Sequence, residues 1–289
     1  MVRFAPSPTG HFHIGNLRTA WISHAWAKAL GTQWIVRFED LDGPRVVSGA
    51  RERQLADLKA LGLEPDKVYV QSERRARHWS LFGEAIGAGR LYPCYCSRTE
   101  VRDALRDMAS APHGEPPVYD GGCRRSPFTG RSTNPTIAWR FADADPSGAN
   151  DFIAARTSPS LPPDEASFAA AYHWACAIDD FDGGYSLIVR AWDLLPALTP
   201  QHALQRWLAG GAPHPIAAFH TALVTGPGGE RLEKRTRGVT LDELAATGIT
   251  PLALAQAFSR GFRANASEYA PGKVWGENPR QVNLDEVLR

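Results

Sequence analysis

In the first 61 residues, short strand-like apolar runs alternate with stretches whose apolar residues have the spacing of a helix. Residues 2–5 form a short strand-like run that stops at residues 6–10, where two prolines and a glycine exclude both a ladder and a helix. Apolar side chains then recur at three- to five-residue steps from residue 13 to Gly31, which predicts a helix that ends at that glycine. An apolar strand at residues 33–38 and a helical pattern through residues 55–61 follow. This alternation predicts a parallel sheet covered by helices.

The pattern changes along the rest of the chain. Residues 91–135 are rich in Cys, Gly, Pro, Ser and Arg and have little periodicity, so we expect a small inserted module. Strand-like runs at residues 137–141 and 185–190 are predicted to rejoin the sheet, with a helical stretch at residues 169–178 between them. The remainder is mainly helical apart from a strand-like run at residues 218–224. The expected organisation is a catalytic domain in two halves (1–90 and 136–198), an insertion (91–135) and a mainly helical subdomain (199–289).

Composition places the chain among ordinary globular proteins. Of its 289 residues 43% are apolar and 22% are charged, which excludes a disordered chain, a coiled coil and a disulfide mini-protein. The net charge is only +1, so a polyanionic partner must be met by a local basic patch. Arginine clusters that could form one lie at residues 74–77, 124–125 and 235–237, although each cluster alone is more often solvated surface. The N-terminus lacks a signal-peptide pattern, so we expect a cytoplasmic protein.

Nucleotide binding cannot rest on the common glycine-rich motifs, because the sequence contains neither a P-loop nor a dinucleotide fingerprint. Residues 3–16 offer another device, a stiff turn that feeds a helix whose free N–H groups and dipole face an anion. His13 can donate to a phosphate oxygen, and Gly15 leaves room for an adenine ring. Far downstream, residues 231–235 follow a glycine-rich turn and could bring Lys234 onto phosphate, although a solvated charge run is the plainer interpretation of that segment.

These segments resemble motifs of the class I aminoacyl-tRNA synthetases, and within them of the glutamyl branch. Residues 6–10 with His13-Ile14-Gly15-Asn16 are similar to that branch's HIGH motif, and residues 231–235 stand where its KMSKS motif belongs. Arg231 replaces the first Lys of KMSKS and Glu233 replaces its Ser. The resemblance covers roughly residues 2–258. It implies a Rossmann-like α/β fold in which His13 and Lys234 are catalytic, and it implies these ATP-binding residues: His13, Gly15, Asn16, Arg231 and Lys234.

Glutamate presents two carboxylates and one ammonium group, so its recognition calls for two cations and one anion. Arg3, Arg190 and Glu39 supply that set at or next to the C-terminal ends of predicted strands, and Tyr172 could add a hydroxyl. A single arginine at a strand end is more often paired with a structural acid, but an ordered set favours a binding site. The resemblance implies the following glutamate contacts: Arg3, Phe4, Ala5, Pro6, Ser7, Glu39, Tyr172 and Arg190.

Three of the four cysteines lie within thirty residues of one another, and in a chain without an export signal this favours metal binding over disulfides. In the related enzymes a C-x-C followed by Y-x-x-x-C binds zinc. The resemblance therefore implies one structural Zn²⁺ held by Cys94, Cys96, Tyr119 and Cys123. His113 is an alternative fourth ligand. Cys176, on an apolar helical stretch, is predicted to be a core thiol.

The resemblance implies an ATP-dependent ligase that activates L-glutamate to glutamyl-AMP, with Mg²⁺ accompanying ATP. The chain length leaves no room for an anticodon-binding module. That fits truncated members that attach glutamate to queuosine, the modified wobble base of tRNA(Asp), so tRNA(Asp) carrying queuosine is the expected partner of a monomeric, membrane-free enzyme. Two alternatives stay open. Glutamate could be passed to another acceptor, such as a tRNA 3′ end or a carrier protein, or Glu233 could mark a catalytically silent RNA-binding paralogue.

Overall fold

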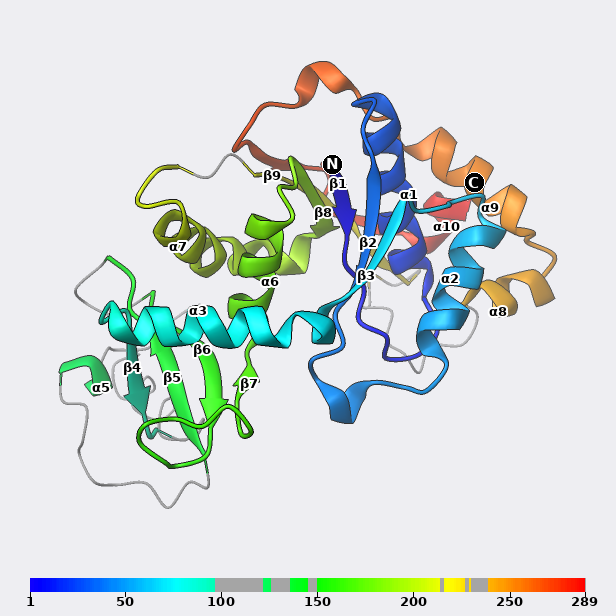
Figure 1. Ribbon diagram of the computed structural model, residues 1–289. Coiled ribbons are helices and arrows are strands. Elements are labelled where there is room, and N and C mark those ends of the chain that lie inside the picture. The colour runs from blue at the N-terminus through cyan, green and yellow to red at the C-terminus, as the bar shows by residue number, and fades with distance from the viewer. Residues whose placement is uncertain are drawn as a thin grey trace. The chain divides into compact units, whose positions relative to one another are not determined.

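Six parallel strands form the sheet that the N-terminal alternation predicts (Figure 1). Their spatial order is β11-β9-β8-β1-β2-β3, so strands that are distant in sequence become neighbours. The strands are β1 (Val2–Phe4), β2 (Trp34–Phe38), β3 (Lys67–Val70), β8 (Leu187–Ala191), β9 (Ala217–Thr221) and β11 (Val274–Gly276). A separate parallel pair consists of β10 (Leu223–Thr225) and β12 (Gln281–Asn283). The predicted α/β class with a parallel central sheet is confirmed.

The computed structural model describes residues 1–96, 122–125, 136–144, 150–213, 216–226, 229 and 239–288. It divides the chain into two compact units. The first unit comprises residues 1–72, 183–196 and 215–289 and contains the parallel sheet, whereas the second comprises residues 73–182 and 197–214. These limits differ from the sequence-based division at residues 91, 136 and 199. Among the described residues, no helix combines the length and apolarity needed to cross a bilayer.

Helices of the first unit share one apolar core with one face of the sheet. They are α1 (Ile14–Ala29), α2 (Ala50–Ala60), α8 (Leu241–Ala246), α9 (Pro251–Gly261) and α10 (Leu284–Leu288), with 3-10 turns η1 (Gly43–Arg45), η3 (Trp192–Ala197) and η4 (Ala266–Glu268). Helix α1 ends at Ala29, two residues before the predicted stop at Gly31, whose φ of +59° is the left-handed conformation that glycine adopts at low cost. Trp26 of α1 packs with Val36 and Phe219 of the sheet in one buried core.

The second unit contains a four-stranded antiparallel sheet in the order β4-β5-β6-β7. Its elements are β4 (Leu91–Cys94), β5 (Ile137–Phe141), β6 (Phe152–Thr157), β7 (Ala169–Ala170), α3 (Arg75–Gly87), α5 (Gly122–Arg125), α6 (Tyr172–Asp182) and α7 (Leu198–Leu208), and η2 (Gln71–Arg74) precedes α3. An aromatic core around Phe82, Trp139 and Trp174 joins the sheet to α3 and α6. Cys176 is buried in α6, as predicted for a core thiol.

The prediction that residues 137–141 rejoin the main sheet is wrong, because β5 pairs with β4 and β6 instead. All five residues of β5 are buried, a pattern that central parallel strands also show. Here the burial has another cause. Ile137 and Trp139 face the aromatic core, whereas Ala138 packs against the cysteine cluster on the opposite face. The predicted strand at residues 185–190 does join the parallel sheet, as β8.

Candidate functional site

Three arginines leave the same face of the parallel sheet. Arg3 of β1 is in register with Ile35 of β2 and Ile188 of β8, and Arg37 and Arg190 lie two residues further along those strands. Because registered partners share a face and side chains alternate with a period of two, all three guanidinium groups project from one face. The apolar core occupies the opposite face. The arginines are almost fully buried, with 3%, 1% and 3% of Arg3, Arg37 and Arg190 exposed.

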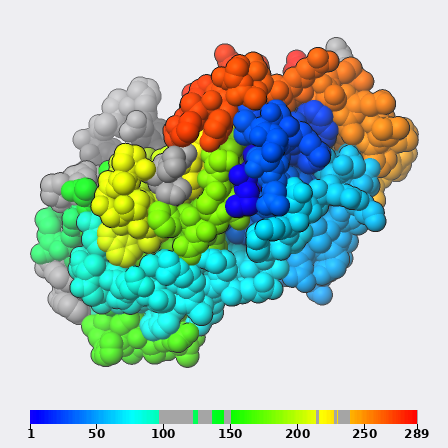
Figure 2. Space-filling view, turned by 45° about the horizontal axis from the view of Figure 1, so that its top comes forward, coloured from blue at the N-terminus to red at the C-terminus, as the bar shows by residue number. Residues whose placement is uncertain are grey.

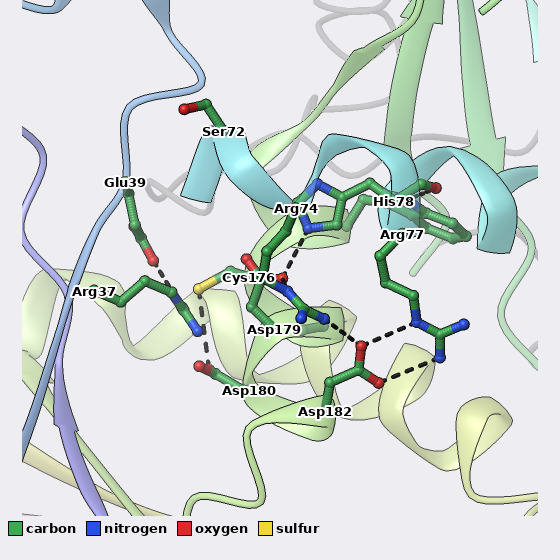
Figure 3. Close-up of polar contacts among 12 residues, drawn as sticks. Arg37, Glu39, Ser72, Arg74, Arg77, His78, Cys176, Asp179, Asp180 and Asp182 are labelled. Carbon is green, nitrogen blue, oxygen red and sulfur yellow. Dashed lines mark hydrogen bonds and ion pairs between the residues drawn. The ribbon is translucent and has the colours of Figure 1, made fainter. Parts of the chain in front are cut away.

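Glu39 supplies the anion at this edge. It follows β2 directly, and its carboxylate accepts from Nη2 of Arg37 at 2.9 Å (Figure 3). Its backbone N–H donates to the carbonyl of Pro6 at 2.9 Å, which holds Glu39 beside the turn that follows β1. Since the C-terminal ends of parallel strands share one edge, Arg190 and Glu39 lie at the edge of the sheet where ligands of α/β folds bind, and Arg3 lies on the strand between β8 and β2.

The remaining predicted glutamate contacts divide between the two units. Phe4 ends β1, and Ala5, Pro6 and Ser7 form the turn beside Glu39, all in the first unit. Gln54 of α2 donates through Nε2 to the carbonyl of Ser7 at 3.3 Å and to that of Gly10 at 2.8 Å, which fixes the course of this turn. Tyr172 belongs to the second unit, where it begins helix α6 and is 38% exposed.

A neutral histidine lies next to Arg190. His220 of β9 is in register with Arg190 of β8, is fully buried and stacks on Trp192 with ring centroids 5.1 Å apart. Burial and then the charge of Arg190 lower the pKa of His220 to about 4. His220 therefore adds no positive charge beside Arg190 at neutral pH.

The start of helix α1 is held by its own histidine. His13 is the N-cap residue, and its Nδ1 accepts from the N–H of Gly15 at 3.1 Å. Because Nδ1 is the acceptor, the neutral ring carries its proton on Nε2, the atom that a phosphate donor role requires. Asn16 completes the cap by accepting from the backbone N–H of His13 at 3.4 Å.

Helix α1 does not present the free N–H groups that the sequence predicts. The N–H of Ile14 donates to the carbonyl of Val239 at 2.7 Å, that of Gly15 to the His13 ring, and that of Asn16 to the His13 carbonyl at 2.9 Å. The first turn is thus satisfied within the protein, so only its dipole and nearby side chains remain for an anion.

Gly15 is needed here for a reason beyond room for a ring. A Cβ at this position would lie 2.9 Å from Cε1 and 3.0 Å from Nδ1 of His13, so any side chain would displace the capping imidazole. Thr240 forms an isolated antiparallel bridge with His13. The chain thus returns to the start of α1 at Val239 and Thr240, directly after a segment, with Arg231 and Lys234, that lies outside the described residues.

Three thiols converge in the second unit. Cys94 ends β4, Cys123 lies in α5, and the sulfur atoms of Cys94, Cys96 and Cys123 all lie within 4.8 Å of one another. Sulfurs bound to one zinc at about 2.3 Å are roughly 3.8 Å apart, so this set fits a tetrahedral ion. The hydrogen bond from Cys123, and then the charge of Arg140, hold the pKa of Cys94 well below its usual range, which favours the thiolate. Tyr119 and His113 lie outside the described residues.

A buried aspartate orients the elements that carry these cysteines. Asp151 accepts from the hydroxyl of Tyr92 on β4 at 2.8 Å, from the N–H of Asp143 at 2.8 Å and from Nη1 of Arg124 on α5 at 3.4 Å. Its side chain is fully buried. Asp151 thereby joins the strand that ends at Cys94 to the helical turn that contains Cys123.

The arginines of residues 74–77 form ion pairs with acidic residues of the second unit. Arg74 and Arg77 both bind Asp182, and Arg74 also binds Asp179 at 2.7 Å (Figure 3). Arg75 donates to the carbonyl of Phe168 at 3.1 Å. These contacts give residues 74–77 a structural role between α3 and α6, which weakens their candidacy as an RNA-facing patch.

Most of this chain matches a family of known proteins. The profile described as tRNA synthetases class I (E and Q), catalytic domain, matches residues 1–269. The chain belongs to this family. Among its relatives, a protein of Nocardia farcinica named glutamyl-Q tRNA(Asp) synthetase is 38% identical over 267 residues, which cover 86% of this chain and 80% of that protein. A protein of the same name from Deinococcus radiodurans is 38% identical over 258 residues, covering 86% and 84%.

Solved structures show the same class I synthetase fold. A glutamate tRNA ligase from Elizabethkingia meningosepticum, crystallised in complex with its amino acid, matches with a TM-score of 0.61 and 23% identity over 99% of this chain. A glutamate-tRNA synthetase from Elizabethkingia anophelis gives a TM-score of 0.60. This chain spans 63% and 64% of those two chains.

Arg37 is a buried residue near the C-terminal end of β2 to which the sequence alone assigns no role in the site. A signal was present, because Arg37 lies between Val36 and Phe38, whose side chains enter the core, and so projects from the opposite face of the strand. An arginine on the other face of such a strand needs a partner, and Glu39, two residues later, provides it.

Proposed function

We propose that this synthetase activates L-glutamate with ATP to form glutamyl-AMP and transfers the glutamate to the queuosine base of tRNA(Asp). The family assignment and the names of relatives that are 38% identical support a glutamate-specific ligase. The observation that supports the proposal is that Arg3 and Arg190 project from one face of the neighbouring strands β1 and β8, while Glu39 directly follows β2, the strand on the other side of β1. Two cations and one anion match the charges of glutamate.

Each charged group of glutamate has a proposed partner. Arg3 and Arg190 bind the two carboxylates, and Glu39 binds the ammonium group. Because Arg37 already donates to one oxygen of Glu39, the carboxylate is oriented before the substrate arrives. The backbone from Phe4 to Ser7 follows β1 in the same unit, and a role for the Tyr172 hydroxyl stays a prediction from the family motif.

The proposed first step is an in-line displacement at the α-phosphorus of ATP. An oxygen of the substrate's α-carboxylate bonds to that phosphorus, the bond to the bridging oxygen breaks, and pyrophosphate leaves. His13 and Lys234 stabilise the phosphate charge, while Gly15, Asn16 and Arg231 complete the nucleotide contacts. Bound Mg²⁺ would shield the phosphates. In the second step a hydroxyl of queuosine attacks the activated carbonyl and AMP leaves.

The thiol cluster is proposed as a structural zinc site. Cys94, Cys96 and Cys123 would hold Zn²⁺, with Tyr119 as the fourth ligand and His113 as the alternative. The ion would fix β4 and α5 together, next to the Asp151 contacts. Elemental analysis is expected to give one zinc per chain, and Cys123→Ser should lower that ratio while Cys176→Ser leaves it unchanged. Protein without stoichiometric zinc would contradict this part. The cytoplasmic location and the monomeric state stay predictions.

Two assays on the purified protein test the function. Glutamate-dependent exchange of pyrophosphate into ATP is expected without tRNA, and Lys234→Ala should lower its rate 10²- to 10³-fold, about 3 kcal/mol of transition-state stabilisation. The exposed Lys59→Ala is the matched control. If no pyrophosphate exchange occurs, only the alternative of a catalytically silent RNA-binding paralogue remains. Glutamate should then label tRNA(Asp) that carries queuosine and not the unmodified tRNA, whereas equal labelling of both would assign the acceptor to the tRNA 3′ end.

A further inference from the structure

The last part of the chain returns to the elements that carry the nucleotide segments. Strand β11 pairs in parallel with β9 at the edge of the six-stranded sheet, and β12 pairs in parallel with β10. In the space-filling view the orange to red C-terminal residues lie directly against the blue N-terminal part of the first unit (Figure 2). The residues of β11 and β12 are not among the proposed substrate contacts.

Glu277, directly after β11, has a hydrogen bond at every polar group. Its N–H donates to the carbonyl of His220 at 2.9 Å, and its carbonyl accepts from Nε1 of Trp192 at 3.1 Å. Its carboxylate accepts from both terminal nitrogens of Arg18 at 2.6 and 2.5 Å and from the N–H of Ala222 at 2.7 Å. Only 12% of the Glu277 side chain and 7% of the Arg18 side chain are exposed.

These contacts join helix α1, which begins at the predicted ATP-binding residues, to the turn between β9 and β10. Arg18 lies on α1, one turn beyond His13 and the cap of that helix. Ala222 lies between β9 and β10, and β10 leads towards the segment that contains Lys234. Asn283 of β12 adds a second tie on that side, because its Nδ2 donates to the carbonyl of Gly226 at 3.2 Å.

A neighbouring contact shows that α1 and the end of β9 are fixed together at more than one point. The hydroxyls of Thr19 and Thr221 are 2.9 Å apart and buried, and Thr19 also bonds the carbonyl of Gly15 at 2.9 Å. This pair links neutral groups, whereas Glu277 links a buried charge on α1 to a backbone N–H before β10. A bidentate guanidinium–carboxylate pair fixes orientation as well as distance.

We infer that Glu277 is a positioning residue that holds helix α1 against the turn between β9 and β10, and so keeps His13, at the start of α1, in the position in which it contacts the phosphates of ATP. This inference rests on the proposed ATP-dependent function. Glu277 itself contacts no substrate. Its loss would leave Arg18 as a buried charge without its carboxylate, and relaxation of Arg18 would displace α1 relative to β10.

ATP affinity separates this role from a merely structural one. Binding of ATP with Mg²⁺ is measured by titration calorimetry on wild-type protein, Glu277→Gln and the control Glu268→Gln, which changes an exposed carboxylate of the same C-terminal segment. We expect Glu277→Gln to weaken ATP binding at least tenfold and the control to match wild type. Binding of glutamate alone, measured in the same way, should change less than twofold. Equal ATP affinity in Glu277→Gln and wild type would overturn the inference, whatever happens to the melting temperature, and so would an equal loss of glutamate binding.

A milder variant keeps the test decisive if Glu277→Gln does not fold. Arg18→Lys retains the charge but cannot make both bonds, so a threefold or larger loss of ATP affinity is expected with folding intact. Unchanged ATP affinity in this variant would contradict the inference. Because ATP binding is read without glutamate, the result is independent of the exchange assay. Wild-type protein that binds ATP but exchanges no pyrophosphate would refute the proposed function while leaving the role of Glu277 decided by the affinities.

Discussion

Two carboxylates on helix α6 bind arginines of the Arg74–Arg77 stretch but differ in burial, and their replacement by alanine should have different costs. Asp179 is 1% exposed at its side chain and accepts from Nε of Arg74 at 2.7 Å and from Nε2 of His78 at 2.8 Å. Asp182 is 21% exposed and binds Arg74 and Arg77, which are themselves 35% and 41% exposed (Figure 3).

The expected loss of stability depends on which polar groups each variant leaves buried without a hydrogen-bond partner. Asp179→Ala strands the N–H of His78, a fully buried residue, at a cost of about 1–3 kcal/mol. The lost pair with Arg74 adds only about 1 kcal/mol, because water and Asp182 replace it at that half-exposed guanidinium. The total is about 2–4 kcal/mol. Asp182→Ala removes solvent-screened pairs only and should cost about 0–1 kcal/mol.

Hydrogen exchange of peptides from α3 and α6 measures the local opening of this unit, and thermal unfolding measures the whole chain. A gap of about 2 kcal/mol between the two variants corresponds to a difference in melting temperature of roughly 4–8 °C. Asp179→Asn keeps an acceptor for both donors and should fall between the two alanine variants. Equal destabilisation by Asp179→Ala and Asp182→Ala would refute the reasoning that burial of His78 decides the cost.

Two further predictions concern the first unit. Gly276→Ala should lower the free energy of unfolding, measured by urea titration, by about 2–3 kcal/mol, because its Cβ would lie 2.3 Å from the carbonyl of His220. The control Gly83→Ala, with open space around it in α3, should be neutral or stabilising in the same measurement. The pKa of His220 is about 6.5 in the unfolded chain and about 4 in the folded protein, so between these pH values the unfolded chain binds a proton that the folded protein does not. The free energy of unfolding should therefore fall by about 3 kcal/mol in all as the pH falls from 6.5 towards 4. His220→Gln should lack this part of the pH dependence measured by denaturant unfolding, and an unchanged pH profile would assign the loss to other groups.

Much of the first unit could be predicted from sequence because its strands and helices bury continuous apolar stripes. The runs that become β1, α1 and β2 are read from periodicity alone. By contrast, β3 has mostly exposed residues, and β11 and β12 are three-residue strands whose pairing depends on tertiary neighbours rather than on local pattern. The same limit explains β5, whose burial fits either a parallel or an antiparallel sheet.

The candidate site was partly predictable for a topological reason. Once the sheet is known to be parallel, charged residues at strand ends must share one edge, so Arg3, Glu39 and Arg190 could be grouped without coordinates. The free N–H groups of α1 were wrongly expected, because Val239, far along the chain, occupies the first of them. A local motif predicts the cap residue but not the distant carbonyl that competes for the same donor.

Whether a charged contact can be predicted from the sequence depends on how far apart its two residues lie along the chain. Arg37 and Glu39 lie two residues apart, so a buried arginine on a strand already suggests its acid. Arg18 and Glu277 are 259 residues apart, and the acid reaches α1 only because β11 adds itself beside β9. No helical or strand period relates the two positions. Candidate substrate-binding groups can therefore be proposed from strand ends, whereas a pair such as Arg18 and Glu277 emerges only from the order of strands in the sheet.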